Sequence, residues 1–159
     1  MKITYRPIGV IHSPFSNLVS MPIQPTSDAS GPGTIEIYAP FVEGLKDLDG
    51  FSHLILLYHL HEARGTALTV TPFLDSVPRG IFATRAPARP NPIGLSIVKL
   101  VRIEDHILHV DDLDVLNGTP LLDLKPYVPE FDHRSGVRTG WLEQAKGEAK
   151  AKVSDERFS

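Results

Sequence analysis

Three polar residues late in the chain alternate with residues of other types. Asp123, Lys125 and Tyr127 lie two positions apart in the stretch LLDLKPY. Residues two apart in a β-strand point to the same side of the sheet, so this spacing predicts one strand face with a carboxylate, an ammonium group and a phenol. Such a face is costly to bury and suits acid–base chemistry on a bound substrate. We therefore take these three residues as the catalytic candidates.

A basic, proline-rich segment, ATRAPARPNPIGLS at residues 83–96, is the second candidate region. Proline fixes φ and lacks an N–H donor, so the segment is predicted to be a stiff loop rather than a helix or a central strand. Arg85 and Arg89 offer planar sets of donors for a carboxylate or a phosphate. Gly94 allows a ligand to approach the backbone. The alternative is a stiff loop that only closes the fold.

The basic residues of this region stand out against the rest of the chain. The formal net charge is −3, yet residues 79–102 contain five basic side chains and no acidic one. A local basic face on an acidic body suits an anionic ligand or a nucleic acid backbone. The alternative is a solvated surface whose arginines pair with neighbouring acids.

Other chemistries find less support. His59 and His61 would share a strand face and suggest a metal site, but no spacing selects a third ligand, so we expect no metal. The chain has no cysteine, which excludes disulfides, thiolate nucleophiles and Cys-based zinc sites. It also lacks the glycine-rich phosphate loops and the G-x-S-x-G motif. No apolar run approaches the ~18 residues of a membrane span, and we expect a cytoplasmic protein with no membrane partner.

The candidates must be positioned by a fold that is rich in short strands. Strands are predicted at residues 3–11, 34–39, 51–60, 68–73, 80–84, 95–104, 107–116 and 120–127, and short helices at 41–48 and 141–152. Such strands with Gly and Pro turns between them favour an all-β fold, mainly an antiparallel or mixed β-barrel. The sequence EDH at 104–106 predicts the turn of a hairpin, and Asn117-Gly118 predicts a second tight turn.

The predicted organisation is one domain at residues 1–142 and a tail at 143–159 that is helical or disordered. Two long loops, at 13–33 and 83–95, are the segments whose composition favours a functional role.

Two of these segments together resemble a known family. FATRAPARPNPIGLS, followed about twenty residues later by NGTPLLDLKPY, is similar to the signature pair of the TsaA-like (TrmO-type) tRNA methyltransferases. Further matches are YRPIGVIHSPF near the start, PIQP at 22–25 and EGLKDLDGFSHLILLYHLH at 43–61, so the resemblance covers roughly residues 3–142. It implies an S-adenosylmethionine (SAM) dependent enzyme with a small β-barrel instead of a Rossmann fold.

The resemblance also implies the reaction and the assembly. The expected reaction is methylation of N6 of threonylcarbamoyladenosine at position 37 of threonine tRNA, next to the anticodon. The expected partners are the tRNA anticodon loop and a second copy of the chain, because in this family the cofactor site is built partly from both subunits. Two alternatives stay open: a SAM-dependent methyltransferase for a small molecule or protein, and an RNA-binding barrel without catalysis.

Site residues follow from the resemblance by position. Cofactor contacts are implied at Pro25, Thr26, Ser27, His61, Glu62, Arg85, Leu95, Asn117, Gly118, Thr119 and Pro120. Arg89 and Asn91 are implied to face the tRNA or the modified base. The family usually has aspartate where this chain has Asn117, and glutamine or another residue where it has Glu62. The long bacterial form continues with a C-terminal extension.

Overall fold

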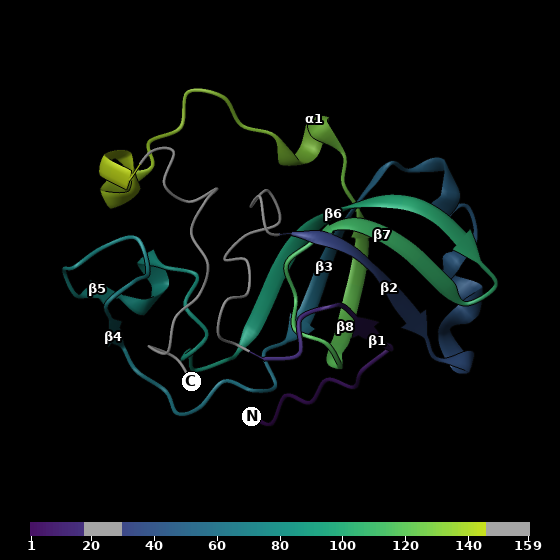
Figure 1. The fold of residues 1–159 in the computed structure, drawn as a ribbon, viewed down its shortest axis with the longest axis horizontal. Coiled ribbons are helices and arrows are strands. Elements are labelled where there is room, and N and C mark those ends of the chain that lie inside the picture. The colour runs from purple at the N-terminus through teal and green to yellow at the C-terminus, as the bar shows by residue number, and fades with distance from the viewer. Residues whose placement is uncertain (18–29, 146–159) are drawn as a thin grey trace.

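A closed antiparallel β-barrel forms the body of the protein. The structure, a computed structural model, describes residues 1–17 and 30–145. The barrel strands are β1 (Gly9–His12), β2 (Gly31–Ile37), β3 (His53–His59), β6 (Ile93–Glu104), β7 (Ile107–Leu113) and β8 (Thr119–Pro126). They close in the order β1-β2-β7-β6-β3-β8, and each neighbouring pair is antiparallel. The predicted all-β barrel is confirmed (Figure 1).

Alternating side chains fill the barrel. In β3, Leu54, Leu56 and Tyr58 are buried, while Ile55 and Leu57 face outward. The closed barrel leaves no strand edge to pair with another chain, and its interior is a continuous apolar core. The buried residues of this core are Ile11, Ile35, Ile37, Leu48, Leu54, Leu56, Tyr58, Val98, Leu100, Leu108, Val110, Leu113, Val115 and Leu121.

A second, smaller unit lies between β3 and β6 in the sequence, at residues 60–92; we call it the small lobe. It contains β4 (Thr69–Val70), β5 (Arg79–Gly80) and the 3₁₀ turn η3 (Ile81–Ala83). Its own buried cluster consists of Val70, Ile81 and Ala86. Figure 1 shows the small lobe to the left of the barrel.

The helices are short, as expected. The predicted helix at 41–48 is replaced by two 3₁₀ turns, η1 (Ala39–Leu45) and η2 (Leu48–Gly50), because Asp47 takes a left-handed conformation between them. After β8 come α1 (Pro129–Asp132) and the 3₁₀ turn η4 (Gly140–Ala145). Residues 146–152 of the predicted C-terminal helix lie outside the described residues.

Most of the residues in three of the predicted strands are not in strands, and the strands predicted at 51–60 and 107–116 are each three residues shorter in the structure. Residues 3–8 are not strand: Pro7 has no N–H to donate, and most of the side chains are exposed. The strand predicted at 68–73 is reduced to β4, which ends two residues before Pro72. The strand predicted at 80–84 bends into η3, where the Thr84 backbone N–H donates to the Ile81 carbonyl. The hairpin of β6 and β7 is confirmed, with Asp105 left-handed at its turn.

Candidate functional site

One end of the barrel gathers the segments that the sequence singled out. Strands β1, β3 and β7 end there, and β2, β6 and β8 begin there. The register confirms this, since Ile11 pairs with Thr119, His59 with Ile93 and Gly31 with Leu113. The connections 13–30, 60–92 and 114–118 therefore all leave the same end. We call it the loop end of the barrel.

The Asn117-Gly118 turn is fixed to the segment that follows β1. Asn117 Oδ1 accepts a hydrogen bond from the Ser13 backbone N–H at 3.1 Å. The Asn117 N–H donates to the Phe15 carbonyl, and the Gly118 N–H donates to the Ile11 carbonyl, both at 2.8 Å. Gly118 has φ +79°, a conformation that favours glycine. The Asn117 side chain therefore holds the loop end together, a role that sequence reasoning did not foresee.

His61 is held by the first residue of β8. The Thr119 hydroxyl donates its single hydrogen to the Leu116 carbonyl at 2.7 Å, so it must accept from His61 Nδ1 at 3.3 Å. This arrangement places the proton of a neutral His61 ring on Nδ1. Nε2, which lies 3.8 Å from Glu62 Oε1, is left as the acceptor. The structure thus brings together His61, Glu62 and Thr119, three of the predicted cofactor contacts.

A chain of polar groups that the sequence did not indicate runs from the barrel interior to this end. Tyr58 hydrogen-bonds Ser96 Oγ at 2.8 Å, and Ser96 Oγ donates to Asp114 Oδ1 at 2.5 Å. Burial raises the pKa of Asp114 to about 6, against the opposing effect of the Ser96 hydrogen bond. Burial and then the charge of Asp114 raise the pKa of Tyr58. The one feature of the sequence that could have pointed to these polar contacts is Ser96, a serine among the otherwise apolar inward-facing positions of a strand.

The two arginines of the proline-rich loop have different environments. The Nη1 group of Arg89 points back into its own loop and donates to the carbonyls of Ile81, Thr84 and Ala86, at 3.2, 2.8 and 3.3 Å. Arg85 is exposed and makes no hydrogen bond or ion pair with a described residue. Arg89 therefore shapes the loop, and Arg85 is the arginine whose donors are open to a ligand. The predicted contact of Arg89 with tRNA stays a prediction.

The catalytic candidates lie on the outer wall of the barrel. Leu121 is buried and pairs with Tyr58, whereas Asp123 pairs with Leu57, so Leu122 is an extra residue without a partner. This irregularity reverses which residues of β8 face inward, as bulges do. Before the irregularity, Thr119 and Leu121 point into the barrel. After it, Leu124 points inward, and Asp123 and Lys125 point outward.

The outer face brings two of the catalytic candidates into contact. Lys125 Nζ lies 2.7 Å from Asp123 Oδ2, and the Tyr127 ring meets the edge of the His53 ring at 6.4 Å. Asp123 and Lys125 thus share one face of β8, which points away from the barrel interior, while Tyr127 follows the end of the strand. Leu95 lies on the same wall, because it pairs with Leu57, the partner of Asp123.

Two of the remaining candidates lie in the part of the chain that the structure describes. Asn91 is exposed, and Pro120 is half-buried in β8. Pro25, Thr26 and Ser27 lie outside the described residues. Within residues 1–17 and 30–145, no group of three or more His, Asp or Glu side chains could hold a metal ion, and no helix is long and apolar enough to cross a membrane.

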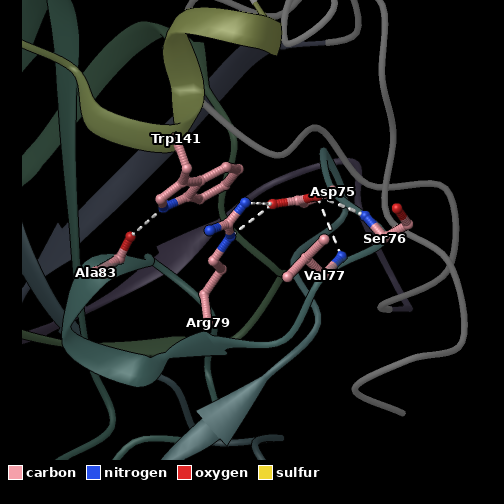
Figure 2. Close-up of polar contacts among 6 residues, drawn as sticks. All are labelled: Asp75, Ser76, Val77, Arg79, Ala83 and Trp141. Atoms are coloured by element: carbon pink, nitrogen blue, oxygen red, sulfur yellow. Dashed lines mark hydrogen bonds and ion pairs between the residues drawn. The ribbon is translucent and has the colours of Figure 1, made fainter.

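A contact from the C-terminal part of the chain secures the small lobe (Figure 2). Trp141 Nε1, in η4, donates to the Ala83 carbonyl at 2.9 Å, and the Arg79 guanidinium lies over the Trp141 ring at 5.7 Å. Arg79 also binds Asp75 Oδ2 through Nε and Nη2, both at 2.7 Å. The start of the proline-rich loop is thereby fixed by contacts from outside the loop in addition to those of Arg89.

Comparison with known proteins identifies the family. Residues 10–133 match the tRNA-methyltransferase O N-terminal domain, which spans the barrel and the small lobe. The chain belongs to this family. The resemblance predicted from RPNPIG and NGTPLLDLKPY is therefore confirmed.

Relatives of the TrmO family are found in archaea and bacteria. A probable S-adenosyl-L-methionine-binding protein of Pyrococcus abyssi is 52% identical over 99% of this chain and 86% of its own length. The tRNA (adenine(37)-N6)-methyltransferase of Escherichia coli is 38% identical over 79% of this chain and 57% of its own length. The crystal structure of TrmO from Pseudomonas aeruginosa superposes with a TM-score of 0.73 at 40% identity, covering 89% of this chain and 63% of that one. The chain thus spans less than two thirds of both bacterial proteins.

Proposed function

We propose that this protein is a SAM-dependent tRNA methyltransferase that methylates N6 of threonylcarbamoyladenosine at position 37 of threonine tRNA. The observation that carries the proposal is the convergence of the two signature segments, the proline-rich loop and the Asn117-Gly118 turn, at the loop end of a TrmO-family barrel. The printed names of the relatives support SAM as cofactor and adenine 37 of tRNA as substrate. We place the protein in the cytoplasm, where tRNA is modified.

The residues of the loop end suit the proposed cofactor. When bound, SAM would supply a methyl group from its cationic sulfur to N6 of the modified adenine and leave as S-adenosylhomocysteine, and the N6 proton would pass to a base among Asp123, Lys125 and Tyr127. Arg85 is available for the carboxylate of the methionine end, and His61 Nε2 can accept a hydrogen bond from the ligand. The stiff loop, held by Arg89, would align the methyl group of SAM with the accepting nitrogen. Such alignment provides much of the rate enhancement in an in-line displacement.

The outer wall suits a second copy of the chain. Ile93, Leu95 and Ile97 are 41%, 44% and 37% exposed in β6 and lie beside the outward-facing residues of β3, with the Asp123–Lys125 ion pair at the rim. An apolar centre with an ion-paired rim is typical of a self-complementary interface. A homodimer through this wall would bring Asp123, Lys125 and Tyr127 of one copy to the substrate bound by the other.

Light scattering after size exclusion tests the homodimer. Ile97→Glu should shift the protein to the monomer and reduce methyl transfer, because it buries a charge in the interface. Val77→Glu, which changes a residue of similar exposure in the small lobe, is the matched control and should stay dimeric. A monomeric wild type would remove the shared site from the proposal.

Mass spectrometry tests the reaction itself. Threonine tRNA that carries threonylcarbamoyladenosine is incubated with the protein and methyl-deuterated SAM, then digested to nucleosides. A deuterated methyl group on that nucleoside is expected, and none on tRNA without the modification. Transfer should weaken as salt rises, because phosphate contacts release counterions. SAM binding without transfer to tRNA would favour a small-molecule or protein acceptor, and tRNA binding without SAM would favour a non-catalytic barrel.

A further inference from the structure

Asp114 is an acidic residue at the loop end, and the proposed function assigns it no role. It follows β7 and begins the connection to the Asn117-Gly118 turn. Ser96, which is 1% exposed, gives its only hydroxyl hydrogen to Asp114, and Tyr58, 7% exposed, in turn donates to Ser96. Both hydroxyls are thus directed toward the carboxylate, and neither is left to donate to a ligand. Such a fully committed chain fixes the position of the carboxylate.

Arg85 belongs to the connection 60–92, which leaves the same end of the barrel as the connection that Asp114 begins. Its positive charge lowers the pKa of Asp114 and of Tyr58, although each effect is smaller than that of burial. Arg85 nevertheless makes no ion pair within 4.0 Å of Asp114, and its side chain is exposed. A largely buried carboxylate and an exposed guanidinium therefore lie at the same end of the barrel without forming an ion pair with each other.

We propose that Asp114 and Arg85 together bind an α-amino acid zwitterion, the methionine end of SAM, with Asp114 accepting from the α-ammonium group and Arg85 donating to the carboxylate. The inference rests on the proposed function. A ligand with only a phosphate would be repelled by Asp114, and a simple cation by Arg85, whereas a zwitterion satisfies both charges. Asn117 does not supply the negative charge, since its side chain is neutral and Oδ1 accepts from Ser13.

This arrangement makes SAM affinity depend on pH. An ammonium group binds the ionised carboxylate, and burial places the pKa of Asp114 at about 6. The charged or hydrogen-bonding groups that face it are Arg85 from the proline-rich loop, Tyr58 from β3 and Ser96 from β6. Below pH 6 the binding-competent fraction falls, so the dissociation constant should rise about tenfold between pH 7 and pH 5.

Calorimetric titration with SAM at pH 5, 6 and 7 tests the inference. Asp114→Asn should weaken SAM binding at pH 7 by about tenfold or more, as loss of a charged hydrogen bond does, and should remove the pH dependence. Asp112→Asn is the matched control two residues away: it is exposed, and asparagine tolerates its left-handed φ, so it should behave as wild type. Far-UV circular dichroism checks the fold of each variant.

A truncated ligand separates the two proposals. 5′-Methylthioadenosine lacks the amino acid end, so its affinity should not change on Asp114→Asn or Arg85→Ala, whereas Arg85→Ala should weaken SAM about tenfold or more. If the wild type binds SAM equally from pH 5 to pH 7, or Asp114→Asn binds SAM like wild type, the inference is wrong and the methyltransferase proposal stands. If Asp114→Asn keeps the pH dependence of the wild type, the inference is likewise wrong. If the wild type does not bind SAM, both proposals fall.

Discussion

The barrel and the small lobe are stabilised in different ways. Among the described residues, fourteen buried residues form the barrel core, whereas the buried cluster of the lobe has three. The barrel strands pair on both sides around a closed sheet, while β4 and β5 are two residues long and pair only with each other. Apolar burial is the dominant source of stability, so most of the folding free energy must come from the barrel.

Polar contacts replace the missing core in the lobe. Arg89 binds three carbonyls, Arg79 pairs with Asp75, and Trp141 donates to Ala83. Such contacts fix geometry but contribute little net stability where water reaches them. The proline-rich loop is thereby held in one shape, although most of its residues are not buried. We therefore expect the barrel to resist local unfolding, and the small lobe to open locally without unfolding of the barrel.

The largest expected effect comes from the barrel core. Leu56→Ala should lower the free energy of unfolding by about 2–5 kcal/mol, because Leu56 is fully buried and its truncation leaves a cavity. Leu68→Ala, in the lobe at 68% exposure, should change it by less than about 0.5 kcal/mol. Urea unfolding measures both. Equal losses for the two variants would contradict the division between scaffold and lobe.

A smaller, local effect is expected for Arg89→Lys. All three contacts come from Nη1, and the shorter side chain of lysine does not bring its ammonium group to that position, so local opening of residues 81–88 should become easier by about 1–3 kcal/mol. Hydrogen exchange should accelerate there while the barrel strands keep their protection. Arg85→Lys is the control, since Arg85 has no such contacts with described residues. Exchange that rises throughout the barrel would show that the lobe is not an independent unit.

The smallest effect concerns acid. The hydrogen bond from Arg79 holds the pKa of Asp75 below its usual value. Because the pKa of Asp75 is lower in the folded state than in the unfolded state, the contact is stabilising at pH values above the unfolded-state pKa. This stabilisation is lost as the pH falls through the folded-state pKa. The fluorescence of Trp141, the only tryptophan, should therefore change as the pH drops below about 4. Asp75→Asn should give the acid-like spectrum already at pH 7, with circular dichroism unchanged; a spectrum like wild type would separate Trp141 from this ion pair.

The β-barrel could be predicted from the sequence, because the alternation of side chains in a strand depends only on residues close together in the chain. The hairpin turn at 104–106, the alternation in β3 and the tight turn at Gly118 each depend on neighbouring residues, and all are present. The extra residue Leu122 was not visible, because a bulge depends on the register of the partner strand. That single residue decides that Asp123 faces outward.

The interior polar chain was missed for a related reason. Tyr58, Ser96 and Asp114 are far apart in the sequence and meet only when β3, β6 and β7 close the barrel. The family resemblance selected Arg85, Asn117 and Thr119, but it did not show that Asn117 binds backbone instead of remaining free. Long-range contacts of this kind need the fold.

Hydrogen exchange with and without SAM tests the central claim most directly, namely that the loop end of the barrel, with the proline-rich loop of the small lobe, forms the cofactor site. SAM should increase protection in residues 83–96 and 113–119. Residues 103–108, at the opposite end, should exchange equally in both samples and serve as the internal reference. Protection at the opposite end, or none in either loop-end segment while SAM is bound, would contradict the account.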